Sequence, residues 1–551
     1  MSIKHFYCKH FYNTMKKQTN KIGLITLLFA GIILLNGCGS TAPLLSTPIE
    51  NIDQTAVKLS EMTEDEDRSW SHLDLIKDSI PGVSLDRAYE ELVKPNGETV
   101  VVAVIDSGID ISHEDLQANV WINEDEIPDN GIDDDKNGYI DDVNGWNFLG
   151  DSTNEQLEYV RLLASKDRSN PRFEEAKALH EKEVEKNKLM KNRLQLVRDR
   201  FKESGEAVAD YLGKDSFTKE EVLAINVDES NIKQQIAVVK QAYGFGYKSI
   251  SALLEDVDRD MKRPKEQLEY YLNIDFDGRK AVGDNPDDID DRDYGDNNVM
   301  PKNGSVHGTH VSGIIAAVRN NGLGANGAAN NVKIMAIRNT PNGDEYDKDV
   351  ALGVYYAVDN GAKIINMSFG KSFSPHSDWV RDAIAYAAKK GVLIVAAAGN
   401  NAENTDEIQY YPNDQLGTGL EVSDTFIKVG STTSKYGSGI VSGFSNYGKS
   451  SVDLFAPGSR IYATVPDGKY RYLQGTSMAS PLVAGIAALV LSQYPKLSAA
   501  QLKQVLLASG LPLNKKVSVG DDSVLPFSDL SRSGRLVNAY NALILASKTS
   551  K

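Results

Sequence analysis

The sequence predicts an α/β fold built on a mostly parallel, twisted sheet, and two observations carry that prediction. Short apolar runs rich in β-branched residues, typical of strands buried on both faces, occur at residues 100–105, 332–337, 363–367 and 392–396. Helical patterns follow the later runs, at residues 349–359, 378–390 and 477–493. Strands that alternate with helices form parallel sheets through right-handed crossovers, so the strands' carboxyl ends meet at one edge, where ligands bind.

The composition indicates a globular protein that does not bind nucleic acid. Of the 551 residues, 41% are hydrophobic and 25% are charged, which is enough apolar material for a sizeable core. The net charge of −17 lacks the basic footprint that nucleic-acid binding requires. The two cysteines, Cys8 and Cys38, lie near the N-terminus, so no disulfide framework can stabilise the rest of the chain. We expect a monomer stabilised by its core and by bound ions.

The first residues predict export. Residues 1–21 carry five lysines and no acid, and an apolar run at 22–35 follows, too short for a comfortable membrane span. The letters LNGC at 35–38 resemble a bacterial lipobox, in which the thiol of Cys38 is lipidated. We therefore expect a signal peptide at 1–37 and a polar, lipidated tether at 38–66; the alternative is an uncleaved anchor helix. Both place the protein outside the cytoplasm, held at a bacterial membrane of the cell envelope.

The α/β domain is expected in two parts, residues 67–150 and 286–551. The stretch between them, 151–285, is charged and short of β-branched runs, and it contains a capping box at residues 218–221. Its apolar residues recur on one helical face: Phe173, Ala176, Met190, Leu194, Val197 and Phe201. We predict an inserted set of helices at 151–285. It is either a lid or exosite that restricts substrates, or a bundle without a role in the reaction.

Three short segments combine into a candidate catalytic site. Asp106 ends the first predicted strand within VIDSG, His307 opens HGTHVSG, and Ser477 lies in GTSMASP at the start of the most apolar helix. Taken singly, each has a plainer explanation, because serine and aspartate often cap helices and a lone histidine is more often structural. A serine hydroxyl becomes an effective nucleophile only when a base accepts its proton, and a histidine held by a carboxylate is such a base near neutral pH.

In this order and context, the three segments closely resemble the signatures of the subtilase family of serine peptidases, over residues 70–150 and 290–546. The resemblance implies a three-layer, subtilisin-like fold. It also implies an endopeptidase that hydrolyses peptide bonds of extracytoplasmic proteins or peptides through an acyl-enzyme, without a catalytic metal. Ser477 would be the nucleophile, His307 the base, and Asp106 the residue that orients and stabilises the imidazole.

The same resemblance assigns residues that bind the substrate and its transition state. Asn400, after the AAAG that ends a strand, matches the family's side-chain donor to the oxyanion, and the Ser477 N–H would be the second donor. An edge segment would pair with an extended peptide, and small residues opposite would line the specificity pocket with room for a sizeable apolar side chain. These residues are Ser368, Phe369 and Gly370 at the edge, and Ala397, Ala398 and Gly399 opposite. Tight sheet packing would also explain the small residues.

An acidic loop predicts a structural calcium site. Oxygen-bearing residues alternate with a glycine at the sixth place, as in the first half of an EF-hand-type loop: Asp133, Asp135, Asn137, Tyr139 and Asp142. Hard oxygen ligands favour Ca²⁺ over transition metals. The closing glutamate is missing, because residue 144 is asparagine, so Asp141 or Asp142 is expected to replace it. The alternative is a solvated acidic turn. A second acidic run at 284–296 is either a solvated face or a further ion site.

Two other functions remain open at this stage. An inactive peptide-binding scaffold on the same fold would keep the architecture but not the reaction. A calcium-dependent adhesion protein would explain the acidic loop but not the three segments.

Overall fold

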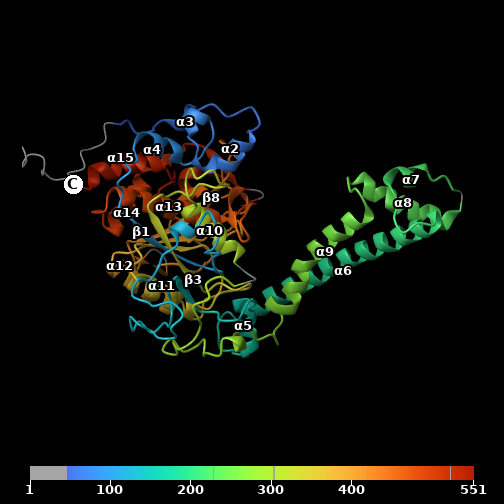
Figure 1. The fold of residues 1–551 in the computed structure, drawn as a ribbon, viewed down its shortest axis with the longest axis horizontal. Helices are drawn as coiled ribbons and strands as arrows, with labels where there is room; N and C mark the ends of the chain where they lie inside the picture. The colour runs from blue at the N-terminus through green and yellow to red at the C-terminus, as the bar shows by residue number, and fades with distance from the viewer. Residues whose placement is uncertain (1–45, 228, 302–304, 418–419, 521–522, 551) are drawn as a thin grey trace, which may run out of the picture.

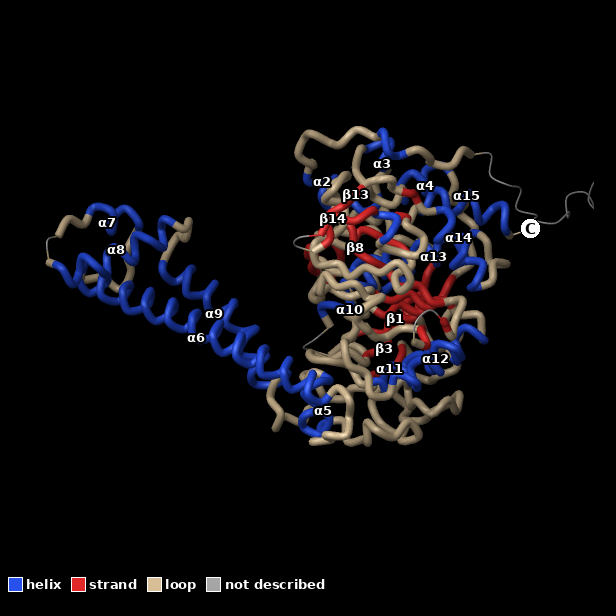
Figure 2. The backbone as a smooth tube through the Cα atoms, turned by 180° about the vertical axis from the view of Figure 1, so that it is seen from behind, coloured by secondary structure: helices blue, strands red, loops and turns tan. Residues whose placement is uncertain are grey.

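The computed structural model describes residues 46–227, 229–301, 305–417, 420–520 and 523–550. The predicted signal peptide and Cys38 therefore lie outside the described residues. A nine-stranded sheet forms the centre of the larger body in Figures 1 and 2, in the order β12-β15-β9-β8-β5-β4-β1-β3-β2. Its neighbours pair in parallel, except β12 with β15. In chain order the strands are β1 (Val100–Asp106), β2 (Gly145–Asn147), β3 (Val332–Arg338), β4 (Ile364–Met367), β5 (Leu393–Ala397), β8 (Phe426–Thr432), β9 (Leu454–Pro457), β12 (Leu511–Pro512) and β15 (Arg535–Leu536). The predicted α/β fold is confirmed.

Helices cover both faces of this sheet. On β1, Val102 and Val104 pack in the core that includes the apolar face of α13, whereas Ala103 and Ile105 pack in the core on the opposite face. This alternation follows from the two-residue period of a strand, and it gives three layers. The first face carries α10 (Val306–Ala316), α13 (Thr476–Gln493), α14 (Ala499–Ser509) and α15 (Ala539–Thr549), and the second carries α11 (Asp347–Asp359) and α12 (Ser377–Lys389).

Helix α13 is the only helix of the described part that is long and apolar enough to cross a membrane. Its most apolar window is 89% buried within the protein, so it is the central helix of the core. The remaining helices of the larger body are α2 (Glu64–Ser69), α3 (Leu75–Asp78) and α4 (Leu85–Glu91). The remaining strands form three two-stranded sheets: β6 (Gln415–Leu416) with β7 (Leu420–Glu421), β10 (Ile461–Val465) with β11 (Lys469–Leu473), and β13 (Lys516–Val519) with β14 (Ser523–Pro526).

The N-terminal part of the chain differs from the predicted tether. Residues 46–66 pack on the α/β body: Ile49 and Ile52 are buried, and the Ile49 main chain exchanges hydrogen bonds with the Asn541 amide at 2.7 and 2.9 Å. The Tyr436 hydroxyl also donates to the Ile52 carbonyl at 2.7 Å. Two isoleucines in a polar stretch did not signal this packing, because their partners lie hundreds of residues away. Within the predicted tether, the segment around Ile49 and Ile52 is therefore fixed to the body.

The predicted insertion is helical. Its elements are α5 (Glu158–Ser165), α6 (Phe173–Leu212), α7 (Lys219–Ala224), α8 (Ser230–Gly244) and α9 (Ile250–Glu266), with one π-helical turn at Gln267–Tyr271. Forty residues of α6 extend for about 60 Å. Helices α6 and α9 lie side by side and project from the α/β body as an arm, with α7 and α8 at its far end (Figures 1 and 2). We call α6 to α9, residues 173–266, the arm.

The arm is stabilised by a hydrophobic core of its own. Phe201 and Val208 of α6 pack with Val239 of α8 and with Leu253 and Val257 of α9. A separate cluster at the base joins α5 and the first turn of α6 to Phe373 of the α/β body. The arm's tip and its attachment to the body are therefore packed independently.

Candidate active site

The structure brings Asp106 and His307 together at the carboxyl edge of the sheet. Asp106 ends β1 and is buried, and its Oδ1 lies 2.8 Å from His307 Nδ1 at the start of α10. The close approach of α10 requires Gly308, because a Cβ there would lie 2.2 Å from the Gly108 carbonyl oxygen. Burial opposes protonation of the imidazole, but the charge and hydrogen bond of Asp106 outweigh it and raise the pKa of His307. The pair therefore has the geometry of an oriented general base.

Ser477 lies in the first turn of α13, at the same edge. Its hydroxyl donates a hydrogen bond of 2.9 Å to the Ser368 carbonyl. Ser368 and His307 line one cleft, and Ser477 reaches it through its hydrogen bond to Ser368. Among the described residues, no hydrogen bond joins Ser477 to His307. Such bonds often form only when substrate is bound, and here the hydroxyl must leave the Ser368 carbonyl to make one.

Asn400 is oriented as an oxyanion donor by the start of α13. Its Oδ1 accepts hydrogen bonds from the Thr476 main-chain N–H at 2.9 Å and from the Thr476 hydroxyl at 3.1 Å. The same hydroxyl accepts from Gly399 N–H at 3.1 Å. Because the amide oxygen is engaged, the two donors on Nδ2 remain for a ligand. No sequence signal indicates this role for Thr476, although it lies next to the predicted nucleophile.

A buried polar network lies beneath the predicted nucleophile. The Ser368 hydroxyl donates to the Ser477 carbonyl at 2.9 Å and accepts from Asn366 Nδ2 at 2.9 Å. Ser480 closes the network, because its hydroxyl donates to Asn366 Oδ1 at 2.7 Å. These contacts tie the first turn of α13 to the end of β4, so Ser477 is fixed from below.

The second histidine of the HGTHVSG segment has a structural role. His310 is buried, and its Nε2 lies 3.1 Å from the Ile461 carbonyl and 3.0 Å from the Arg471 carbonyl. Two acceptors at Nε2 place the proton there. Burial lowers the pKa of His310 to about 4, so this ring is neutral at physiological pH.

The predicted specificity pocket has an aromatic residue between its two walls. Gly370 follows β4 and Gly399 follows β5, and these strands are neighbours in the sheet. A Cβ built on Gly370 would lie 2.5 Å from the Tyr410 ring, and one on Gly399 would lie 2.8 Å from it. Tyr410 therefore lies against the small wall residues, in the space predicted for a substrate side chain.

The base of the arm lines the cleft beside His307. This cleft has a volume of about 760 Å³ and is bounded on one side by His307, Val306 and Ser368. Lys262 and Glu266, at the end of α9, bound it as well. They are one helical turn apart, with 3.7 Å between Lys262 Nζ and Glu266 Oε1. Part of the insertion therefore belongs to the active-site cleft, as a lid or exosite would require.

The acidic loop predicted to bind calcium lies next to a carboxylate other than the one expected. Carboxylate oxygens of Asp133, Asp135 and Glu126 lie within 4.8 Å of one another. Glu126 precedes the loop, and it also accepts main-chain hydrogen bonds from residues 134, 135 and 141. Asp141 instead accepts hydrogen bonds from the main chain of residues 130 and 131. Asp141 therefore does not join the predicted ligands; the Glu126 carboxylate lies beside Asp133 and Asp135 instead.

The other predicted calcium ligands surround this group. Asn137 Nδ2 donates to Asp135 at 3.1 Å and to Asp142 at 3.0 Å, while the Tyr139 ring packs against Trp146, so only the Tyr139 carbonyl is suited to bind an ion. Asp142 is buried and has no cationic partner among the described residues, and burial raises its pKa. Carboxylates gathered without a compensating cation suit Ca²⁺.

Part of the second acidic run is paired with basic side chains. Asp284 is buried against Arg279 and Lys348, at 2.6 Å from each, and Asp287 lies 3.0 Å from His376 Nε2. The described residues contain no metal-binding group of three or more carboxylates or histidines in this run. These contacts favour a structural role over a further ion site.

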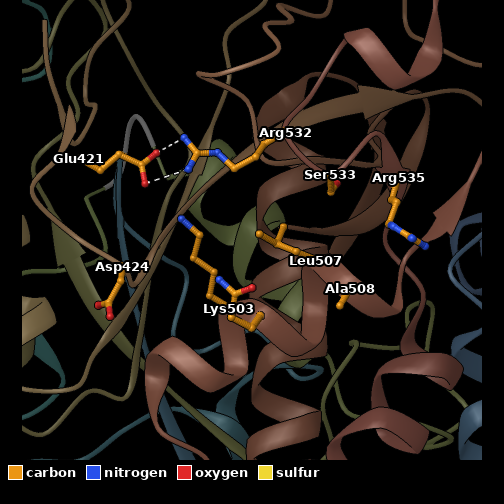
Figure 3. A pocket seen from close by; sticks show the side chains of 9 residues that line it. Glu421, Asp424, Lys503, Leu507, Ala508, Arg532, Ser533 and Arg535 are labelled. Carbon is orange, nitrogen blue, oxygen red and sulfur yellow. Dashed lines mark hydrogen bonds and ion pairs between the residues drawn. The ribbon is translucent and has the colours of Figure 1, made fainter. Parts of the chain in front are cut away.

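A separate pocket of about 340 Å³ lies between α14 and the turn before β15, and Figure 3 shows its side chains. None of the predicted site residues lines it. Arg532 pairs with Glu421 across it, and Lys503 donates to the Phe426 carbonyl at 2.6 Å. These two cations already have partners within the protein.

A parallel α/β sheet with an Asp–His pair and an anchored serine at its carboxyl edge is an arrangement of serine hydrolases. The model of the subtilase family matches residues 97–523 of this chain. The protein belongs to the subtilase family.

Curated relatives share a large part of the α/β body. The chain is 40% identical over 275 residues to the thermophilic serine proteinase of Bacillus sp. strain AK1, covering 50% of this chain and 59% of that one. It is 42% identical over 203 residues to thermitase of Thermoactinomyces vulgaris, covering 36% of this chain and 66% of that one. It is 36% identical over 219 residues to subtilisin DY of Bacillus licheniformis, covering 39% and 74%. The chain thus spans less than two thirds of the first two relatives.

Proposed function

We propose that this protein is a serine endopeptidase in which Ser477 attacks the peptide carbonyl and His307 takes its proton. The observation that carries the proposal is the 2.8 Å contact between Asp106 Oδ1 and His307 Nδ1. His307 and Ser368 line the same cleft, and the Ser477 hydroxyl donates to the Ser368 carbonyl. Asp106 holds His307 in the tautomer that carries its proton on Nδ1, so Nε2 is free to act as the base. Asp106 then stabilises the imidazolium that forms. The free Nδ2 of Asn400 donates to the developing oxyanion, as does the main-chain N–H of Ser477.

The remaining steps use the same groups. The imidazolium of His307 gives its proton to the leaving amine, and the acyl group stays on Ser477. A water molecule then loses a proton to His307, attacks the ester and releases the acid product. No metal takes part in these steps. The buried network under Ser477 keeps the main-chain donor of the oxyanion hole in place during both halves of the reaction.

A fluorophosphonate probe tests this proposal directly, since it reacts only with an activated serine. The full chain should be labelled at Ser477 and should cleave an unfolded protein. Ser477→Ala should lose both properties and keep the melting temperature, whereas the control Ser438→Ala, at an exposed serine, should retain both. Cleavage that persists in Ser477→Ala would refute the assignment. A folded protein that is not labelled would instead favour the inactive peptide-binding scaffold.

We propose that the enzyme acts outside the cytoplasm, lipid-anchored at Cys38, on exported proteins or peptides. The predicted lipobox supports this placement. Because the main chain of Ile49 is hydrogen-bonded to the body, ten residues at 39–48 remain between the anchor and that contact. Ten residues span at most about 35 Å, so the enzyme would work close to the membrane surface. Membrane fractionation of the full chain tests the anchor: Cys38→Ser should release the protein from the membrane, and retention would exclude lipidation at this cysteine.

We propose a structural Ca²⁺ held by Glu126, Asp133 and Asp135, with Asp142, Asn137 and the Tyr139 carbonyl around it. The ion would stabilise the loop before β2 and take no part in the reaction. A ligand that binds only the folded state at 100 times its Kd adds about 2.7 kcal/mol of stability. Removal of calcium with EGTA should therefore lower the melting temperature by several degrees. Asp133→Asn should start lower and lose this response, and an unchanged response would exclude the site.

We propose that the base of the arm restricts which substrates reach the cleft. Lys262→Ala/Glu266→Ala should change the cleavage rate of a folded protein relative to that of a short chromogenic peptide. A second variant replaces residues 199–257 with a short glycine–serine turn. The turn is feasible because α6 and α9 lie side by side at this level, where Arg198 Nε and Asp258 Oδ1 form an ion pair of 2.6 Å. This deletion keeps both cleft residues. Equal effects on both substrates in each variant would leave the arm without a role in selection.

A further inference from the structure

Tyr410 is placed where a substrate side chain would have to enter. In the proposed reaction, the residue immediately before the cut bond projects between the edge segment, 368–370, and the opposite wall, 397–399. Tyr410 lies between the two: its ring is within contact distance of the Gly370 and Gly399 main chains. Gly399 has φ of +104°, a conformation that favours glycine, and its carbonyl accepts a 3.0 Å hydrogen bond from Asn446 N–H, so this wall is fixed.

The Tyr410 ring is held at both ends. Its hydroxyl donates to the Gly370 carbonyl at 3.0 Å. Its own carbonyl accepts from Lys428 Nζ at 3.0 Å and from Asn413 Nδ2 at 3.1 Å. The next residue, Tyr411, pairs with Lys371 through two main-chain hydrogen bonds of 2.9 and 3.0 Å. A ring fixed at its hydroxyl and at its backbone cannot leave the pocket without breaking several contacts.

The phenol remains a hydrogen-bond donor under working conditions. Burial, followed by the charges of Glu345 and Asp344, raises the pKa of Tyr410 well above its usual range. The neutral hydroxyl therefore keeps its bond to Gly370 at neutral and mildly alkaline pH, where a His307 base operates. The Tyr410 ring therefore occupies the pocket throughout the pH range of the proposed reaction.

We infer that Tyr410 is a specificity-determining residue that closes the pocket to large side chains, so that the enzyme cuts after glycine, alanine or serine. The inference rests on the proposed peptidase function. The small wall residues then serve a purpose different from the one that the sequence suggested, because they accommodate the protein's own aromatic ring. A substrate side chain of one or two heavy atoms fits beside this ring, whereas leucine, phenylalanine or tyrosine would have to displace it.

The test compares peptide substrates that differ only in the residue before the cut bond. With the full chain, we expect kcat/KM for alanine to exceed that for phenylalanine by at least about tenfold, since one misfit methylene already changes such ratios by 10- to 200-fold. Tyr410→Ala should reverse or flatten this preference by a similar factor. Tyr410→Phe keeps the ring but loses the hydroxyl bond to Gly370, so it should keep the preference for small residues.

The outcomes separate this inference from the proposed function. A wild-type enzyme that cuts equally well after phenylalanine overturns the inference, as does a Tyr410→Ala variant with an unchanged preference. Should Tyr410→Ala fail to fold, cleavage sites mapped by mass spectrometry in an unfolded protein report the wild-type preference without any variant. Absence of both cleavage and fluorophosphonate labelling of Ser477 would instead refute the peptidase assignment itself.

Discussion

Replacing Asn400 by aspartate should separate transition-state stabilisation from folding. In the structure, Asn400 Oδ1 accepts two hydrogen bonds from Thr476, and Nδ2 is the proposed donor to the oxyanion. Asn400→Asp keeps an oxygen that accepts from Thr476, but it replaces the Nδ2 donor by a second carboxylate oxygen. Losing one oxyanion donor lowers kcat by about 100- to 1000-fold, or about 3–4 kcal/mol. A negative charge facing the developing oxyanion adds to this loss, so we expect the upper end of the range with little change in KM.

The stability of this variant should stay close to that of the wild type, because the contacts with Thr476 are retained. Asn400→Ala provides the contrast. It removes the acceptor as well as the donor and leaves the buried N–H of Thr476 without its partner, which costs about 1–3 kcal/mol. The neighbouring Asn401 is exposed, so Asn401→Asp controls for the added charge.

The assay measures kcat and KM on one chromogenic peptide and the melting temperature of each variant. The reasoning is refuted if Asn400→Asp retains kcat within about threefold of wild type, or if its loss is matched by Asn401→Asp. It is also refuted if Asn400→Asp is destabilised as much as Asn400→Ala, because the acceptor role would then not be preserved.

Three further predictions concern the same edge of the sheet. Because Asp106 raises the pKa of His307 and the base must be neutral, kcat/KM should rise with pH through a midpoint above 6.5, and Asp106→Asn should shift that midpoint downward and reduce kcat by about 10⁴-fold. Burial would raise the pKa of Glu158, but its two cationic partners outweigh burial and lower the pKa to about 2. Glu158 therefore stabilises the fold above its unfolded pKa of 4.5, and this contribution is lost as the pH falls toward 2. Denaturant titrations should show wild type losing about 2 kcal/mol more than Glu158→Gln between pH 6 and pH 3, and equal losses would contradict this. Gly308→Ala should lower kcat by more than about tenfold by displacing α10 from β1, as a 1 Å misplacement can cost a hundredfold; unchanged kinetics would show that the contact can relax.

The central strands were predictable because each carries its own local signal. The run that became β1 is apolar and β-branched on both faces, as a strand between two helical layers requires, and it was located within one residue. Asp106, His307 and Ser477 were found for a related reason: each lies in a distinctive short segment at the end of such an element. Glycine at 308 then permits the close approach of α10 to the end of β1.

Residues that act through distant packing gave no local signal. Glu126 precedes the acidic loop in an ordinary acidic stretch, and only the fold of the loop brings it to Asp133 and Asp135. Tyr410 lies ten residues beyond Asn400 in a loop, and nothing in its surrounding sequence indicates that it reaches the Gly370 carbonyl. Such contacts depend on how two loops meet, and neither hydrophobic period nor motif spacing encodes that.

The arm's separate core has a thermodynamic consequence. Phe201, Val239 and Val257 are buried only against other arm residues, whereas α13 and the strands under Ser477 share a different core. Cooperative units with separate cores can open at different free energies. On heating, the helices of the arm can melt as one unit while Asp106 and His307 keep their contact. Selectivity toward folded proteins would then disappear at a lower temperature than the hydrolysis of short peptides.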